Sequence, residues 1–120
     1  MKLLCLAALA AVSVTHAQTV WKLASGYSPE TFQTENLAQF AQDVAAASGQ
    51  RLKIDIAPNG NLFKLPEIRQ AVEDGRVQAG EVIMTGMVQA VPLAGADAIP
   101  FVVGSYKDAQ RLWQFQRPVL

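Results

Sequence analysis

The sequence predicts an α/β fold in which a sheet of mainly parallel strands is covered by helices. The first observation is the order of its segments: strand-like and helix-like stretches alternate along the chain, which favours parallel strands joined by helical crossovers. The second is the length of 120 residues, which accommodates one small domain at most. The third is a composition that is 51% hydrophobic and 17% charged, as is typical of a globular protein.

The first seventeen residues are typical of a secretory signal peptide. Lys2 supplies a positive charge, and the apolar run Leu3–Val14 has the length of a signal-peptide core. We expect cleavage after Ala17, which leaves residues 18–120 as the mature chain. The alternative is a transmembrane anchor, which this run disfavours because a helix needs about 20 apolar residues to span a bilayer.

Composition excludes several classes of chemistry. Ten basic and ten acidic residues give a formal net charge of zero, so bulk charge does not attract nucleic acid or an anionic membrane. The only cysteine, Cys5, and the only histidine, His16, both precede the expected cleavage site. A zinc site of Cys and His ligands, a Cys–His pair and a Ser–His–Asp triad are therefore not expected. No other residue is singled out as catalytic. Rossmann and P-loop fingerprints do not occur in the sequence, so no cofactor is expected.

The first half of the mature chain predicts a strand, a helix and a second strand. Thr19–Ala24 has the composition of a strand, and Leu52–Ile56 alternates apolar with polar residues as a half-buried strand does. The helix between them should begin with Ser28 or Thr34 as its N-terminal cap and end at Gly49. Its buried face is predicted to comprise Leu37, Phe40, Ala41, Val44 and Ala45.

The second half continues the alternation for two more elements. A turn at residues 58–61 leads to a helix over Leu65–Val72, which ends before Gly75. A third strand is predicted near Ala79–Thr85. Gly86–Asp97 is predicted to be irregular because it contains proline and glycine.

The C-terminal stretch is predicted to hold one further short strand and one helix. Pro100 limits Ala98–Val103 to an edge or irregular strand. Ser105 and Asp108 have the spacing of a capping box at the start of the last helix. Apolar side chains should line this helix and pack in the core: Ala109, Leu112, Trp113 and Phe115.

The loop after the first predicted strand is a candidate binding site. Ser25, Gly26 and Tyr27 lie between the carboxyl end of that strand and the following helix, where ligands bind in open α/β sheets. Backbone N–H groups and the helix dipole favour an anion at such a place. Glycine would let the backbone approach a ligand closely, and the tyrosine could stack or form a hydrogen bond. The alternative is an ordinary turn with a helix cap.

Glu81 and the residues after it form a second candidate. A carboxylate in so apolar a stretch needs a partner or an opening to solvent, and it could accept hydrogen bonds from a ligand hydroxyl or amine. The alternative is an edge-strand charge that faces water. Met84 and Thr85, at the end of the predicted strand, could line a cleft, although methionine also serves as core filling. Glu73 and Asp74 are predicted to form a solvated face rather than an acid–base pair.

Taken in order, these segments resemble the solute-binding proteins of tripartite ATP-independent periplasmic (TRAP) transporters, the DctP-type family. The resemblance extends from Val20 to Trp113, and Ile99–Phe101 followed by a helix is its most telling element. The segments that carry it are Trp21–Ala24, Asn36–Gly49, Leu52–Pro58, Asn61–Leu62, Ile68–Gly75, Val77–Thr85 and Ala98–Trp113.

The resemblance implies a two-lobed periplasmic protein that captures a small organic acid between its lobes. It implies delivery of this carboxylate to a small and a large integral membrane subunit, with no enzymatic activity and no nucleic-acid partner. Residues 18–120 would be the N-terminal part of the solute-binding domain, a partial lobe with the second lobe absent, because the arginine with which the family pairs the carboxylate lies after Leu120. The alternatives are an exported enzyme of unknown chemistry and a lone-lobe interaction module.

The resemblance also implies which residues line the cleft. The matching segments are the loop after the first strand, the end of the third strand and Asn59–Phe63. The expected ligand-binding residues are Ser25, Gly26, Tyr27, Glu81, Met84 and Thr85. The arginines of this chain match surface positions of the family and are not expected to bind the carboxylate: Arg51, Arg69 and Arg76.

Overall fold

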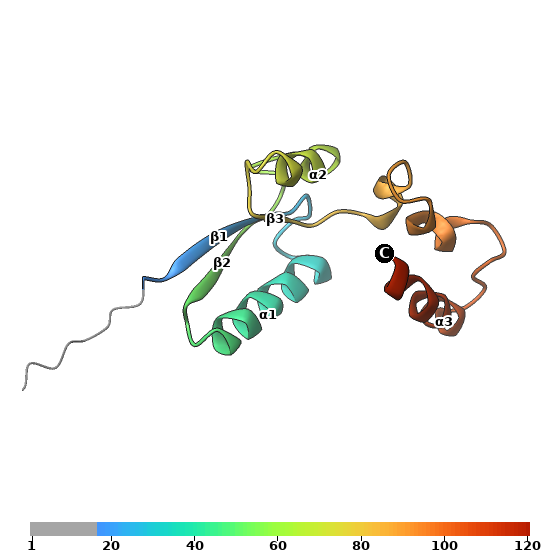
Figure 1. Ribbon diagram of the computed structural model, residues 1–120, viewed down its shortest axis with the longest axis horizontal. Coiled ribbons are helices and arrows are strands. Elements are labelled where there is room, and N and C mark those ends of the chain that lie inside the picture. The colour runs from blue at the N-terminus through green and yellow to red at the C-terminus, as the bar shows by residue number, and fades with distance from the viewer. Residues whose placement is uncertain (1–16) are drawn as a thin grey trace, which may run out of the picture.

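The computed structural model describes residues 17–120 of the chain. The predicted signal peptide falls on residues 1–17 and so lies outside the described residues except for Ala17. The first five elements are β1 (Thr19–Ala24), α1 (Phe32–Ala47), β2 (Leu52–Ala57), α2 (Leu65–Glu73) and β3 (Ala79–Gly80) (Figure 1). No helix within residues 17–120 is long and apolar enough to cross a membrane.

The three strands form one parallel sheet in the order β2-β1-β3, as the alternation of segments predicts. β1 and β2 pair over their whole length, from Thr19 opposite Leu52 to Ala24 opposite Ala57. β2 lies on one side of β1 and β3 lies on the other. The crossover from β1 to β2 and the crossover from β2 to β3 therefore run across the sheet in opposite directions. Right-handed crossovers then place the two helices on opposite faces, and Figure 1 shows α1 and α2 on opposite sides of the strands.

Helix α1 begins later than Ser28 and earlier than Thr34, so neither predicted cap is the N-cap. Thr31 occupies that position, and the hydroxyls of Thr31 and Thr34 both donate to the Ser28 carbonyl at 2.9 Å. The predicted end of the helix is confirmed, because Gly49 follows the C-cap with a φ of +59° that suits glycine. Phe40, predicted on the buried face, is 49% exposed.

The core lies between α2 and the sheet. Its buried members are Ala24 of β1, Ile68 and Ala71 of α2, and Val77. Ile68 is fully buried, and its Cγ2 would lie 2.3 Å from a Cβ atom at position 80. Helix α2 can therefore approach β3 this closely only because Gly80 has no side chain.

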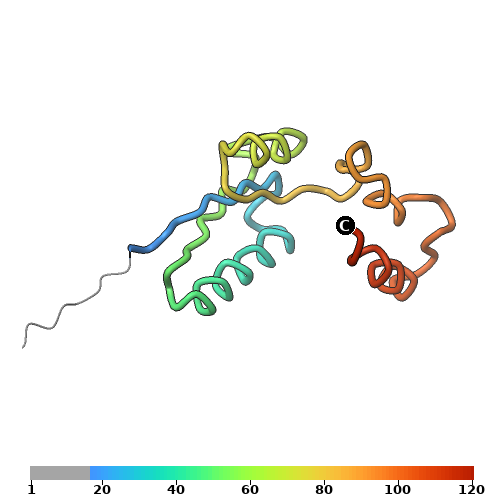
Figure 2. The backbone as a smooth tube through the Cα atoms, viewed as in Figure 1, coloured from blue at the N-terminus to red at the C-terminus, as the bar shows by residue number. Residues whose placement is uncertain are grey.

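The third strand is shorter than predicted, since β3 ends at Gly80 rather than Thr85. The N–H of Glu81 still donates to the Ala24 carbonyl at 2.9 Å, but β1 ends at Ala24 and offers no further partner. Val82 and Ile83 therefore leave the sheet, and Figure 2 shows an extended link from the sheet to the C-terminal elements.

The C-terminal elements are η1 (Met84–Met87), η2 (Pro92–Ala98), α3 (Tyr106–Gln116) and η3 (Arg117–Val119), the η elements being 3₁₀ helices. They contact one another: η1 packs on η2, and α3 packs on η2 and η3. The side-chain amide of Gln116 donates to the Leu93 carbonyl at 2.6 Å, which ties α3 to η2. The region predicted to be irregular thus holds two short helices.

Two further expectations fail in this region, and one is confirmed. Ala98–Val103 forms no strand, because Pro100 lacks an N–H and Phe101 is fully exposed with a φ of +69°. Trp113 is 47% exposed and Phe115 is 78% exposed, so neither is buried in a core. Ser105 caps α3 as predicted, accepting a 3.1 Å hydrogen bond from the N–H of Asp108.

Candidate functional site

The carboxyl ends of the three parallel strands meet at one edge of the sheet. Ser25 follows β1, Pro58 follows β2 and Glu81 follows β3. This is the edge at which open α/β sheets bind ligands. The order and direction of the strands thus bring the loop candidates and the Glu81 candidate together.

Ser25 and Glu81 are hydrogen-bonded across this edge. The Ser25 hydroxyl donates to Glu81 Oε2 at 2.6 Å, and the Tyr27 N–H donates to the same hydroxyl at 3.2 Å. Ser25 is fully buried, and its own N–H donates to the Ala57 carbonyl at 3.0 Å. The predicted need of Glu81 for a partner is met by Ser25, which fixes the carboxylate at the carboxyl end of β3.

Backbone hydrogen bonds join the loop after β1 to the turn after β2. The N–H of Asn59 donates to the Tyr27 carbonyl at 2.6 Å, and the N–H of Gly60 donates to the Ser25 carbonyl at 2.9 Å. Asn59 and Gly60 have φ values of +61° and +64°, which asparagine and glycine tolerate best. Segment 59–63 thereby becomes a support for the candidate loop.

Gly26 is a point of close approach, but to α2 rather than to open space. A Cβ atom at this position would lie 2.8 Å from the Cβ atom of Leu65. The glycine therefore lets the loop after β1 pack directly on the first turn of α2.

A cavity of about 230 Å³ opens between α2 and the link that follows β3. Leu65, which packs on Gly26, forms part of its wall, and so does Thr85, one of the predicted site residues. Met84 lies elsewhere: it lines a separate cavity of about 140 Å³ together with Trp113. The structure thus brings Ser25, Tyr27 and Glu81 together by hydrogen bonds, with Gly26 between them in the loop. Thr85 lines the cavity beside α2, and Met84 lines a separate one.

Arg69 also lines the cavity between α2 and this link, and its side chain is 41% exposed. It follows Leu65 by four positions on α2, and residues with this spacing share one face of a helix. Arg51 lies at the opposite edge of the sheet, and Arg76 lies over the Phe63 ring at 4.8 Å. Both are exposed, as expected of surface residues.

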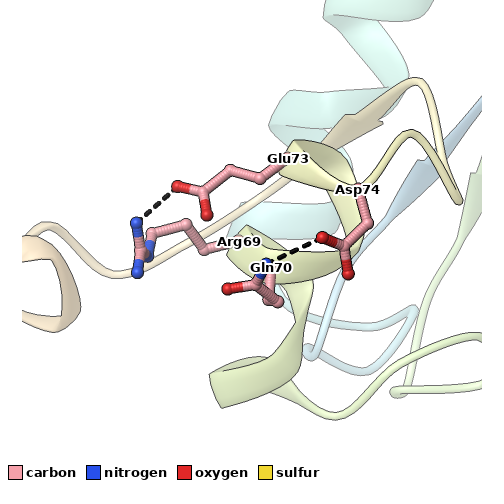
Figure 3. A network of polar contacts seen from close by, with 4 residues as sticks. All are labelled: Arg69, Gln70, Glu73 and Asp74. Carbon is pink, nitrogen blue, oxygen red and sulfur yellow. Dashed lines mark hydrogen bonds and ion pairs between the residues drawn. The ribbon is translucent and has the colours of Figure 1, made fainter.

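The exposed face of α2 carries two polar pairs, shown in Figure 3. Arg69 forms an ion pair with Glu73, and the Gln70 amide donates to Asp74 at 2.8 Å. Glu73 and Asp74 are both exposed, so the prediction of a solvated acidic face is confirmed. Within residues 17–120, no group of three or more His, Cys, Asp or Glu side chains is placed to hold a metal ion.

Titration of the Glu30 carboxyl, in the loop before α1, can test a hydrogen bond within this loop. The Ser28 hydroxyl donates to Glu30 Oε2 at 2.7 Å, and this bond, together with a backbone hydrogen bond, lowers the pKa of the Glu30 carboxyl. The charged form is favoured in the fold, so this contribution to stability is present above the ordinary pKa and lost as the pH falls through the lowered one. We expect NMR titration to give a depressed Glu30 pKa that Ser28→Ala returns toward its ordinary value. An equally depressed pKa in that variant would contradict the assignment.

The chain is similar to known solute-binding proteins. The sequence model of the bacterial extracellular solute-binding proteins of family 7 matches residues 23–118. The Bordetella pertussis receptor DctP6, crystallised as a binder of pyroglutamic acid, is 37% identical, with a TM-score of 0.78 over 84% of this chain and 34% of its own. A TRAP solute-binding protein from a marine metagenome, in complex with pyroglutamate, is 34% identical, with a TM-score of 0.80 over 86% of this chain and 34% of its own.

More distant structures share the fold. A TRAP periplasmic solute-binding protein from Sulfitobacter sp. NAS-14.1, with bound β-D-galacturonate, is 21% identical with a TM-score of 0.72. No curated protein sequence matches the chain. The chain spans about a third of the length of the solved relatives. The family match over residues 23–118 shows that the chain belongs to the bacterial extracellular solute-binding proteins of family 7.

Proposed function

We propose that this chain is part of the solute-binding component of a TRAP transporter and captures a small organic acid. The observation that carries the proposal is the 37% identity, over 84% of the chain, to a receptor that binds pyroglutamic acid. Residues 1–17 would direct export as a cleaved signal peptide, and capture would take place in the periplasm. Delivery to the integral membrane subunits of the transporter would follow, and no reaction would be catalysed.

The geometry at the carboxyl edge of the sheet supports such a ligand. Glu81 is held by the buried Ser25 hydroxyl, and its carboxylate is only half-buried, so it can also accept a hydrogen bond from a ligand. Pyroglutamate carries one N–H donor, on its lactam ring, besides its carboxylate. A carboxylate acceptor in the protein matches that N–H, and a cation is required for the acid group.

Residues 18–120 would then form the N-terminal part of the binding domain. The chain covers 34% of the length of each of these two relatives, so in them further polypeptide completes the protein. Ser25, Gly26, Tyr27, Glu81, Met84 and Thr85 are proposed as this part's contribution to the ligand site.

Calorimetric titration with pyroglutamate tests the proposal, using the polypeptide encoded by the whole reading frame. We expect saturable one-to-one binding without turnover, and a stabilisation of about 2.7 kcal/mol at a ligand concentration of 100 times Kd. The matched control is 2-pyrrolidinone, which keeps the lactam ring and lacks the carboxylate; it should bind far more weakly. Failure to bind pyroglutamate or any other organic acid, or conversion of the ligand to product, would overturn the proposal.

A further inference from the structure

The Ser25 hydroxyl already has its partners within the protein. A hydroxyl has one hydrogen to donate, and that of Ser25 goes to Glu81 Oε2 at 2.6 Å. The same hydroxyl oxygen accepts the Tyr27 N–H at 3.2 Å, and Ser25 is fully buried. Ser25 therefore has neither a hydrogen nor an accessible surface for a ligand, and any effect that it has on one must pass through Glu81.

The second oxygen of the Glu81 carboxylate is open. Among residues 17–120, no hydrogen bond or ion pair reaches Oε1. No buried side-chain oxygen or nitrogen in this part of the chain lacks a partner, so Oε1, which has none, is accessible to solvent. A carboxylate accepts hydrogen bonds and donates none, so the group that meets Oε1 must be a donor.

We propose that Glu81 determines the ligand specificity of this site: its Oε1 accepts the ring N–H of a compact lactam acid, and Ser25 is the positioning residue that holds the carboxylate in place. The carboxylate of the acid points away from Glu81, because like charges at hydrogen-bonding distance repel each other. This inference rests on the proposed capture of an organic acid and narrows its class to acids with an N–H beside the carboxylate.

An acid without this N–H leaves Oε1 unsatisfied. Such an acid displaces water from the carboxylate and gives it no hydrogen bond in return. A site that binds an N–H therefore rejects an analogue lacking it more strongly than an apolar pocket rejects the loss of a methylene group. The matched analogue of pyroglutamate is the cyclopentanone carboxylate in which a methylene group replaces the ring N–H. It keeps the ring shape, the ring carbonyl and the carboxylate.

Calorimetry on the polypeptide of the whole reading frame compares pyroglutamate with this methylene analogue. The unaltered protein is expected to bind pyroglutamate about 10- to 100-fold more tightly, the loss that follows from one hydrogen bond to a charged group. Equal affinity for the two acids, or tighter binding of the analogue, would overturn the inference.

The bond from Ser25 also predicts the behaviour of Glu81→Gln. The buried hydroxyl needs an acceptor, so the amide oxygen takes the place of Oε2 and the amide NH₂ group takes the place of Oε1. Two donors then face each other, and the preference for pyroglutamate over the methylene analogue should fall below about threefold. The corresponding lactone, in which a ring oxygen replaces the N–H, should bind more tightly to this variant than to the unaltered protein. An unchanged preference, or no gain for the lactone, would show that Oε1 does not face the ring.

Asp74→Asn is the control for the change of charge. Asp74 lies on the exposed face of α2, where it accepts from Gln70 and contacts Arg76 at 3.5 Å. This variant should keep the preference for pyroglutamate. An equal fall in Asp74→Asn and Glu81→Gln would reduce the effect to net charge and overturn the inference.

Ser25→Ala tests the positioning role. The preference between the two acids is measured on folded protein, so a loss of stability alone does not change it. Loss of the fixed position of Glu81 should lower it. An unchanged preference in Ser25→Ala would overturn the role of Ser25.

The proposed function and this inference can fail separately. Failure of the unaltered protein to bind any organic acid would overturn both. Saturable binding of organic acids without a preference for the one that carries the N–H would overturn this inference alone and leave acid capture intact. Both comparisons use the unaltered protein, so they do not depend on whether a variant folds.

Discussion

Replacing Gly80 with alanine is expected to lower the free energy of unfolding by about 1–3 kcal/mol, the cost of overpacking a close-packed core. A Cβ atom at this position would lie 2.3 Å from Ile68 Cγ2 and 3.2 Å from Val72 Cγ2. Ile68 is fully buried, so it cannot move aside into solvent. Helix α2 must instead shift away from β3. Urea unfolding followed by circular dichroism measures the effect.

The matched control is Gly86→Ala. A Cβ atom at Gly86 would meet no other atom within 4 Å, so this substitution should change the free energy of unfolding by less than about 0.5 kcal/mol. A double-mutant cycle identifies the clash directly. In an Ile68→Ala background, Gly80→Ala should lower the free energy of unfolding by clearly less, because the obstructing methyl group is gone. An equal cost in both backgrounds would show that the destabilisation does not arise from the contact with Ile68.

Strand β2, helix α2 and the C-terminal ends of α1 and α2 could be predicted because each depends on a pattern of residues that are close in the sequence. Alternation in Leu52–Ile56 and the apolar spacing of Leu65–Val72 each reflect one element burying one face. Gly49 and Gly75 end their helices with φ values of +59° and +71°, a conformation for which glycine is the natural residue. Such features need no knowledge of the rest of the chain.

The length of the third strand could not be predicted in this way. Val82 and Ile83 have strand composition, but a strand also needs a neighbour with free hydrogen-bonding groups. That neighbour, β1, ends at Ala24, a property of a segment more than fifty residues earlier. The same reasoning applies to Ala98–Val103, which has strand composition and no strand partner among residues 17–120.

The candidate site was predicted in part. Ser25 was singled out by its place after a predicted strand and Glu81 as a charge in an apolar stretch, and the structure brings the two into contact. Their pairing depends on the register of β1 with β3, which no local pattern specifies. The place of Arg69 beside a cavity could not be predicted, because it follows from where residues 82–87 run after they leave the sheet. Whether these side chains contact the ligand stays a prediction.

Removing the Ser25 hydroxyl is the second large effect expected. Ser25→Ala should lower the free energy of unfolding by about 1–3 kcal/mol, because the Glu81 carboxylate and the Tyr27 N–H both lose a partner. Ser25 is fully buried, so water cannot replace its hydroxyl without a rearrangement. Glu81 would also lose its fixed position, so the affinity for the organic acid that we propose as the ligand should fall together with the stability.

The chain contains a matched control for this substitution. Ser28 donates to Glu30 at 2.7 Å, almost the distance between Ser25 and Glu81, but this pair is exposed and joins residues two positions apart. Ser28→Ala should therefore change the free energy of unfolding at neutral pH far less than Ser25→Ala does. Glu81→Gln adds a second comparison, since its amide oxygen can still accept the hydrogen bond, though without the charge. Equal losses of unfolding free energy in Ser25→Ala and Ser28→Ala would mean that burial does not strengthen the hydrogen bond between Ser25 and Glu81. A larger loss in Ser25→Ala than in Glu81→Gln would mean that the hydroxyl itself, more than the charge it meets, holds the carboxyl edge of the sheet together.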